Sequence, residues 1–232
     1  MSTYLIIGAS SGIGQQLTTQ LAAQGHQVYA TYCKNKIDSA DSLIQYHYLN
    51  VLDETMTLDN LPDTIQGVVY CPGSINLKPF SRISASDFVN DYNLQVIGAV
   101  KVIQAILPKL KAADFSSILL FSTVAVQSGL PFHSQVSASK GAIEGLTKAL
   151  AAEFAPKIRV NCIAPSLTDT PLAASLLNSD QKKEANAQRH PLKRIGTTDD
   201  ITNMAEFLLS AKAGWITGQI IHVDGGISTI KI

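Results

Sequence analysis

The stretch Gly8-Ala9-Ser10-Ser11-Gly12-Ile13-Gly14 decides the fold of this chain. It follows the short apolar run 4–7 and opens an amphipathic stretch over residues 12–24 that Gly25 ends. Glycines let a backbone turn tightly and let a diphosphate approach, and the N-terminus of the following helix offers free N–H groups. Spaced as GxxxGxG, the glycines alone also fit an ordinary strand-to-helix turn. Their place between an N-terminal strand and a helix favours a dinucleotide-binding βαβ unit.

The same alternation of short apolar runs and longer amphipathic stretches continues to the C-terminus. This pattern is typical of βαβ units around a parallel sheet with helices on both faces. No linker, low-complexity tract or repeat interrupts it, so residues 1–232 are expected to form one domain. The predicted strands are residues 4–7, 27–32, 44–49, 67–71, 117–121, 158–163 and 219–223.

Four helices carry readable signals. The first is 12–24, and the second spans 86–111, where Pro108 is expected to end or kink it. The third and longest is 136–154, which Pro156 limits. A fourth opens at 197–200, a run of Thr and Asp residues that cap helices well.

Composition excludes several classes of protein. Eighteen Lys and Arg balance eighteen Asp and Glu, which removes the electrostatic case for a nucleic-acid binder. Hydrophobic residues make up 46% of the chain and charged residues 16%, which excludes global disorder. Cys33, Cys71 and Cys162 form no CxxC pair or Cys/His cluster, so no metal site is predicted. No apolar run reaches the length of a membrane span and no signal peptide is visible, so a cytoplasmic protein is expected.

Five stretches together resemble the short-chain dehydrogenase/reductase family, and within it the 3-oxoacyl-carrier-protein reductases and related carbonyl reductases. They are the glycine turn 8–14, Asn50-Val51, 69–73, 159–165 and 218–226. The resemblance covers nearly the whole chain. It implies a single doubly wound Rossmann-type α/β domain, whose seven-stranded parallel sheet has the order 3-2-1-4-5-6-7. It also implies an oxidoreductase acting on a small carbonyl or alcohol.

The resemblance further implies which residues bind the cofactor. Ser166 stands where the family usually has glycine. The implied cofactor-binding residues are Gly8, Ser10, Ser11, Gly12, Ile13, Gly14, Tyr32, Lys34, Asn50, Val51, Pro72, Gly73, Lys140, Pro165, Thr168 and Thr170.

The end of the second strand favours NADP over NAD. An acidic residue there would bind the adenosine ribose hydroxyls and select NAD. The segment 30–36 contains no Asp or Glu, and Lys34 and Lys36 would favour a 2′-phosphate. The alternative is that both lysines are solvated loop charges.

The catalytic positions match the family only in part. The resemblance implies an Asn, a Ser, a proton-donating Tyr, and a Lys four residues after that Tyr. Lys140 fits the Lys, but Val136 stands four residues before it, and no tyrosine follows Tyr92. Thr123 stands at the Ser position and Gln95 at the Asn position. A general acid is typically worth about 10²–10⁴ in rate, so the loss of the tyrosine is a large change.

His133 is a candidate substitute for the missing acid. Residues three and four apart share a helix face, so a helix reaching back to His133 would place its imidazole on the face of Val136 and Lys140. The alternative is a partly solvated histidine at the helix start. His26, His47, His190 and His222 have no motif context and are predicted to be structural or exposed.

Two functions therefore stay open. One is an NADP-dependent oxidoreductase with a non-standard active site, in which His133 or a bound water supplies the proton. The other is a nucleotide-binding pseudoenzyme that serves as a sensor, regulatory or structural subunit.

Assembly and substrate contacts follow from the same resemblance. Helices 86–111 and 136–154 match those that pair subunits in relatives, so a homotetramer or homodimer is expected. Ala142, Gly145 and Ala149 would allow close approach of helices, although a core-facing stripe is the alternative. Residues 172–190 fall where the family has its variable substrate loop.

Overall fold

Seven parallel strands form one sheet in the order β3-β2-β1-β4-β5-β6-β7. The computed structural model describes residues 1–58 and 60–231. The predicted strands and their order are confirmed, with ends shifted by one or two residues. The strands are β1 (Thr3–Ile7), β2 (Gln27–Tyr32), β3 (Ile44–Tyr48), β4 (Gly67–Tyr70), β5 (Ser116–Phe121), β6 (Ile158–Pro165) and β7 (Ile220–Val223).

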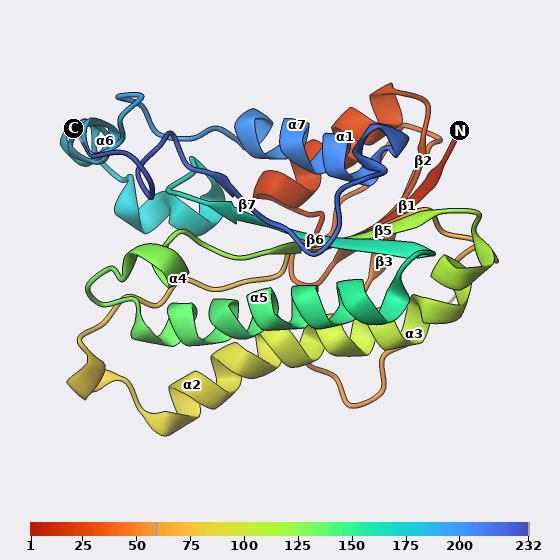
Figure 1. The fold of residues 1–232 in the computed structure, drawn as a ribbon, viewed down its shortest axis with the longest axis horizontal. Coiled ribbons are helices and arrows are strands. Elements are labelled where there is room, and N and C mark those ends of the chain that lie inside the picture. The colour runs from red at the N-terminus through yellow and green to blue at the C-terminus, as the bar shows by residue number, and fades with distance from the viewer. Residues whose placement is uncertain (59, 232) are drawn as a thin grey trace.

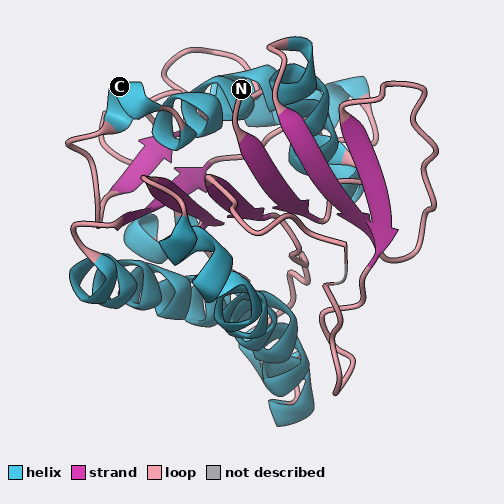
Figure 2. Cartoon of the chain, turned by 90° about the vertical axis from the view of Figure 1, so that its right-hand side faces the viewer, coloured by secondary structure: helices cyan, strands magenta, loops and turns pink. Residues whose placement is uncertain are grey.

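Helices cover both faces of the sheet, as Figures 1 and 2 show. On one face lie α1 (Gly12–Ala23) and α7 (Thr198–Leu209), and on the other lie α2 (Ala85–Tyr92), α3 (Gly98–Ala112) and α5 (Ser134–Phe154). Each face has its own cluster of buried apolar side chains. Because both faces are covered, all six residues of β5 are buried.

The helix between 86 and 111 differs from the prediction. It is divided by a π-helical turn, Asn93–Ile97, which joins α2 to α3. The wider turn inserts an extra residue into the helical path and buries Gln95 and Val96. Pro108 lies inside α3 and does not end it. Pro108 and Gln104, whose carbonyl loses its helical donor, are both exposed, so that carbonyl does not have to be satisfied within the core.

The shorter elements follow the same chain path. They are α4 (Ala125–Ser128), α6 (Asp180–Gln188) and the 3-10 turns Phe80–Arg82, Pro171–Leu176 and Ala211–Ala213. The predicted start of α7 is confirmed, because Thr197 and Asp200 form a capping box. Across residues 1–58 and 60–231, no helix has the length and apolar character needed to cross a bilayer.

The strand order reverses between β1 and β4, which lie side by side although β2 and β3 separate them in the chain. In open parallel sheets, ligands bind at the carboxyl ends of the strands where the order reverses. The glycine turn leaves β1 at this point.

Candidate active site

The glycine turn is held tightly between β1, β2 and α1. Gly8 and Gly12 adopt φ angles of +77° and +54°, which favour glycine. A Cβ atom on Gly14 would lie 2.4 Å from the carbonyl oxygen of Gly8. The backbone N–H of Ala9 donates to the carbonyl of Thr31 at 2.7 Å. The turn therefore places α1 against the end of β1 as closely as a backbone allows.

The N-terminus of α1 is suited to an anion. Ser11 is its N-cap and has extended backbone angles, and its side chain makes no capping hydrogen bond. The N–H groups of a first helical turn have no partner within the helix and carry a partial positive charge. A phosphate placed here would accept hydrogen bonds from these groups.

A cavity of about 520 Å³ opens beside the turn. Its walls come from the carboxyl ends of β4, β5 and β6, from the start of α5, and from α6 and the segment leading to it. The sequence-predicted residues that line it are Ile13, Gly73, Gln95, Thr123, His133, Val136, Lys140, Pro165, Thr168 and Thr170.

The remaining predicted cofactor residues lie outside that lining, around the glycine turn and the ends of β2 and β3. A Cβ on Gly8 would lie 3.2 Å from the ring of Pro72, and one on Gly12 would lie 3.4 Å from Thr170. The turn therefore meets the segments after β4 and β6. The residues outside the cavity lining are Gly8, Ser10, Ser11, Gly12, Gly14, Tyr32, Lys34, Asn50, Val51 and Pro72.

Two of these outer residues already have local roles. The Asn50 amide donates to Asp53 at 2.7 Å, and its carbonyl oxygen accepts from the N–H of Leu52. Val51 is 6% exposed and belongs to the apolar core. The side chain of Asn50 therefore closes its own loop, and any contact with a nucleotide base would compete with these hydrogen bonds.

Lys140 projects from α5 into the cavity wall. Its Nζ and Gln95 Oε1 lie 3.8 and 3.5 Å from the point where a Gly73 Cβ would stand. Burial lowers the pKa of Lys140 to about 8, although Cys162, Asp91 and Cys71 act in the opposite direction. The amine is thus a partly buried cation near neutral pH.

Lys140→Met is expected to raise the free energy of unfolding of the cofactor-free chain by about 2 kcal/mol near pH 7. The folded chain has a lower pKa at this position, about 8, than the unfolded chain. The unfolded chain therefore keeps this proton up to a higher pH than the folded chain does. The destabilisation that the charged Lys140 causes in the natural chain decreases as pH rises from about 8 to about 10. Urea unfolding of the natural chain and of Lys140→Met near pH 7 and pH 10 measures the two free energies of unfolding. A difference between the two chains that does not change with pH would contradict this cause.

Asp91 organises the residues behind Lys140. It is 4% exposed and accepts hydrogen bonds from Gln95 Nε2 at 2.7 Å, from Ser139 Oγ at 2.6 Å and from Ser74 Oγ. Because the Gln95 nitrogen is used in this way, Oε1 points to the other side. That oxygen is buried and has no hydrogen-bond partner in the described part of the chain. It is thus available to a donor such as a water or the Lys140 amine.

Thr123 and Val136 both line the cavity. Thr123 lies two residues after β5, and its Oγ1 accepts from the N–H of Ala125 at 3.3 Å. Val136 is 8% exposed and lies one helical turn before Lys140 on α5. An apolar side chain here gives no proton, so another group must supply it.

His133 precedes α5 and does not share a helical face with Val136 and Lys140. The helix α5 begins at Ser134, two residues before the predicted start, and His133 is its N-cap with φ −100° and ψ 10°. Its Nδ1 lies 2.7 Å from the carbonyl oxygen of Pro131. The helix therefore does not extend back to His133, and the alternative of a partly solvated histidine at the helix start is confirmed, although its half-buried ring lines the cavity.

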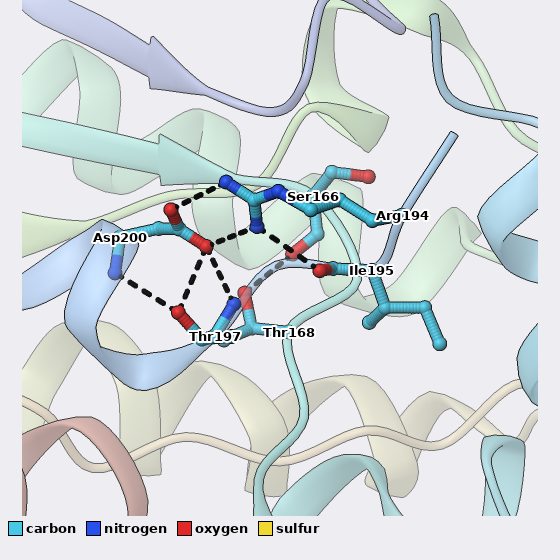
Figure 3. Close-up of polar contacts among 6 residues, drawn as sticks. All are labelled: Ser166, Thr168, Arg194, Ile195, Thr197 and Asp200. Carbon is cyan, nitrogen blue, oxygen red and sulfur yellow. Dashed lines mark hydrogen bonds and ion pairs between the residues drawn. The ribbon is translucent and has the colours of Figure 1, made fainter. Parts of the chain in front are cut away.

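A polar network fixes the segment after β6 (Figure 3). Arg194 forms two hydrogen bonds with Asp200, at 2.5 and 2.7 Å, and these hold the pKa of Asp200 well below its usual range. Asp200 also accepts from Thr197 at the start of α7. Thr168 Oγ1 donates to the carbonyl of Ser166 at 3.0 Å, and Thr168 pairs with Gly196. The network anchors one wall of the cavity to α7.

Comparison with known proteins agrees with this geometry. A family profile described as Enoyl-(Acyl carrier protein) reductase matches residues 8–228. The chain is 33% identical over 242 residues to the 3-oxoacyl-[acyl-carrier-protein] reductase FabG of Staphylococcus aureus, covering 96% of each chain. It is 31% identical to the FabG of Thermotoga maritima, again covering 96% of each.

The chain belongs to the short-chain dehydrogenase/reductase family. It is thus a member of a family of oxidoreductases. A short-chain type dehydrogenase/reductase from Mycobacterium ulcerans has the same fold with a TM-score of 0.86 and 28% identity, over 98% of this chain and 90% of that one. ElxO, in a structure with NADP bound, shares the fold with a TM-score of 0.90 at 24% identity, over 99% of this chain and all of that one.

Two features of this short-chain dehydrogenase/reductase were not predicted from its sequence. Asp91 carries no motif, and its partner Ser139 is 48 positions away. His190 gave no signal either, because the residue it meets in the cavity wall lies 24 positions away. Both positions acquire meaning only from tertiary contacts.

Proposed function

We propose that this chain is an NADP-dependent oxidoreductase that interconverts a small carbonyl compound and its alcohol in an active site that departs from the family pattern. The observation that carries the proposal is the shared cavity of Thr123, Gln95 and Lys140 beside the glycine turn. Its walls are mostly apolar, including Leu130 and Leu176. An apolar pocket with a few convergent polar groups is what a small organic substrate requires.

The residues present fit a dinucleotide cofactor. The N–H groups at the start of α1, with Gly8, Gly12 and Gly14, would hold the diphosphate. Lys140 would bind the nicotinamide ribose, and the Thr168 backbone and Thr170 hydroxyl would bind the carboxamide. When bound, this cofactor supplies or accepts the hydride.

The chain's own side chains would then manage the substrate oxygen. Thr123 Oγ1 is available to donate a hydrogen bond to it, which stabilises the negative charge that develops there during reduction. Gln95 and the charge of Lys140 lie on the same side of the cavity. Val136 cannot supply the proton, and His133 is one donor that the cavity lining offers.

Lys34→Ala is expected to weaken NADPH binding about tenfold and to leave NADH binding nearly unchanged. The reason is that an exposed lysine at the end of β2 would pair with the 2′-phosphate that only NADPH carries. Lys157→Ala is the matched control, because Lys157 is also exposed but directly precedes β6, at the amino end of the sheet. Fluorescence titration of both cofactors measures the effect. Equal loss of NADPH and NADH affinity would contradict it.

The experiment that tests the function combines cofactor binding with turnover. NADPH fluorescence reports binding to the purified chain, and a panel of carbonyl compounds reports NADPH oxidation. We expect binding and turnover in the natural chain, with turnover lost in Lys140→Ala. Absence of NADPH binding would overturn the proposal.

A nucleotide-binding pseudoenzyme is the second candidate, and Val136 is the observation that favours it. Such a protein would bind NADPH and turn over no carbonyl on the panel. The same experiment therefore separates the two functions.

We also propose that the chain assembles as a homodimer or homotetramer. Gly145 and Ala149 on α5 are exposed, whereas Ala142 packs against the apolar core, so two of the three small residues are free to face another helix. Two helices meeting over small residues approach closely. Sedimentation as a monomer would contradict this assembly.

A further inference from the structure

Ser166 and His190 meet at the wall of the cavity. Ser166 follows β6 directly, and His190 lies two residues beyond α6. Ser166 Oγ is 2.8 Å from His190 Nε2, and both residues line the cavity. His190 is 3% exposed, whereas Ser166 is only partly buried. The serine is therefore the member of the Ser166–His190 pair that a substrate reaches first.

The second ring nitrogen fixes the state of the imidazole. His190 Nδ1 lies 2.9 Å from the backbone carbonyl oxygen of Asn186. A carbonyl oxygen only accepts hydrogen bonds, so Nδ1 carries a hydrogen. In the neutral imidazole, Nε2 therefore accepts the hydroxyl hydrogen of Ser166.

Protonation of the imidazole reverses the direction of this hydrogen bond. In the imidazolium, Nε2–H donates to Ser166 Oγ, and the hydroxyl hydrogen is released to point elsewhere. Because Ser166 lines the cavity, this hydrogen can then be donated to a ligand there. One proton on His190 thus converts Ser166 from a group that accepts from a ligand into one that donates to it.

The pair also lies next to the other polar group of the site. The N–H of Val124 donates to the carbonyl of Pro165 at 3.2 Å. Thr123 and Ser166 are the chain neighbours of these two residues, so they flank one hydrogen bond between the segments that follow β5 and β6. Thr123 and Ser166 also line the same cavity, so a substrate in it can meet both hydroxyls.

We propose that the Ser166–His190 pair donates the proton that completes carbonyl reduction, an inference that rests on the proposed function. Once the carbonyl carbon has accepted a hydride from the reduced cofactor and the C–O π bond has broken, the oxygen is an alkoxide. The alkoxide takes the hydroxyl hydrogen of Ser166, and Nε2–H passes to Ser166 Oγ. The products are the alcohol, the oxidised cofactor and neutral His190, which regains a proton from solvent. Alcohol oxidation uses the same transfers in reverse.

The pair is better placed for this task than His133. In both histidines Nδ1 lies against a backbone carbonyl oxygen. They differ because His133 is only half-buried, so that water competes for its ring, whereas His190 is buried and its Nε2 lies against the Ser166 hydroxyl. A group held in one orientation before the substrate arrives loses less entropy in the transition state.

Two measurements test the pair. Nitrogen-15 NMR of the cofactor-free chain reads the His190 tautomer, and Nδ1–H with a bare Nε2 is expected for the neutral ring. Steady-state kinetics with NADPH and the best carbonyl substrate then compare the natural chain with Ser166→Ala, Ser166→Thr, His190→Gln and His133→Gln. His26→Gln is the matched control, since His26 lies at the opposite, amino end of the sheet.

We expect kcat to fall about 100-fold in Ser166→Ala and His190→Gln, with KM and NADPH affinity changed less than about threefold. Ser166→Thr keeps the hydroxyl and retains turnover, which a mere packing role would not require. If His190→Gln does not fold, Ser166→Ala still tests whether the pair donates the proton, because it removes only a single oxygen.

Other outcomes separate this inference from the proposed function. Turnover that survives both Ser166→Ala and His190→Gln overturns the pair and leaves the oxidoreductase standing. Loss of turnover in His133→Gln alone assigns the proton to His133 instead. A hydrogen on Nε2 and none on Nδ1 also overturns the pair. NADPH binding without any turnover in the natural chain overturns both the pair and the oxidoreductase.

Discussion

Val136→Tyr is expected to raise the turnover of the Ser166→Ala variant about 100-fold, while raising that of the natural chain less than about tenfold. The new hydroxyl would stand one helical turn before Lys140, on the wall of the same cavity. The buried amine there favours the ionised form of a neighbouring phenol, which makes the phenol a better acid–base group at neutral pH. The gain is large only where no other donor remains. NADPH oxidation across the carbonyl panel measures it.

Val136→Phe is the matched control, because it adds the same ring without the hydroxyl. Turnover that rises equally in Val136→Phe would attribute the gain to packing. An equal 100-fold gain in the natural chain and in Ser166→Ala would mean that Ser166 donates no proton, and would favour the pseudoenzyme.

Gly14→Ala is expected to lower the free energy of unfolding by about 3–5 kcal/mol and to abolish NADPH binding. The added Cβ would lie 2.4 Å from the Gly8 carbonyl oxygen and 3.2 Å from Ala9 Cα, and both neighbours are backbone atoms. Backbone cannot move aside as a flexible side chain does. The helix α1 must then separate from β1, which also displaces the N–H groups at its start. Urea unfolding and NADPH titration measure the two effects.

Gly141→Ala is the control for this glycine effect. It lies within α5, and an added Cβ would meet only Val126 at 3.9 Å, an ordinary contact. Alanine is favoured over glycine in a helix by up to about 1 kcal/mol, so this variant should be slightly more stable. A Gly14→Ala chain as stable as the natural one would mean that the turn can open without cost.

The strands of the sheet could be predicted from the sequence because each strand is a short apolar run between two turn signals. All seven strands, the first helix to within one residue and the start of α7 are confirmed. The division of 86–111 was not predictable, since a π-helical turn leaves the apolar spacing of Val96, Ala99 and Ile103 close to that of a regular helix. Pro108 does not end the helix, because an exposed helix side tolerates a missing hydrogen bond.

The candidate site was predictable only where a motif exists. The glycine turn and Lys140 follow from local spacing, and they meet the cavity or border it. Asp91, Ser166 and His190 form their key hydrogen bonds with residues far away in the chain. A single sequence does not show which helix end packs over which strand end. The contacts of Asp91 with Ser139 and of Ser166 with His190 therefore became visible only in the structure.

The π-helical turn at Asn93–Ile97 makes the junction between α2 and α3 sensitive to the number of residues in it rather than to their types. One residue of a helix corresponds to a rotation of about 100°. Deleting any residue of the turn would rotate α3 by that amount relative to α2. The row Val102, Ile106 and Leu110 would then leave the sheet, although each residue would be unchanged. Exposed Ile97 can vary in identity, whereas the number of residues between Asp91 and Gly98 acts as a fixed frame that holds the Gln95 amide in the site and α3 on the core.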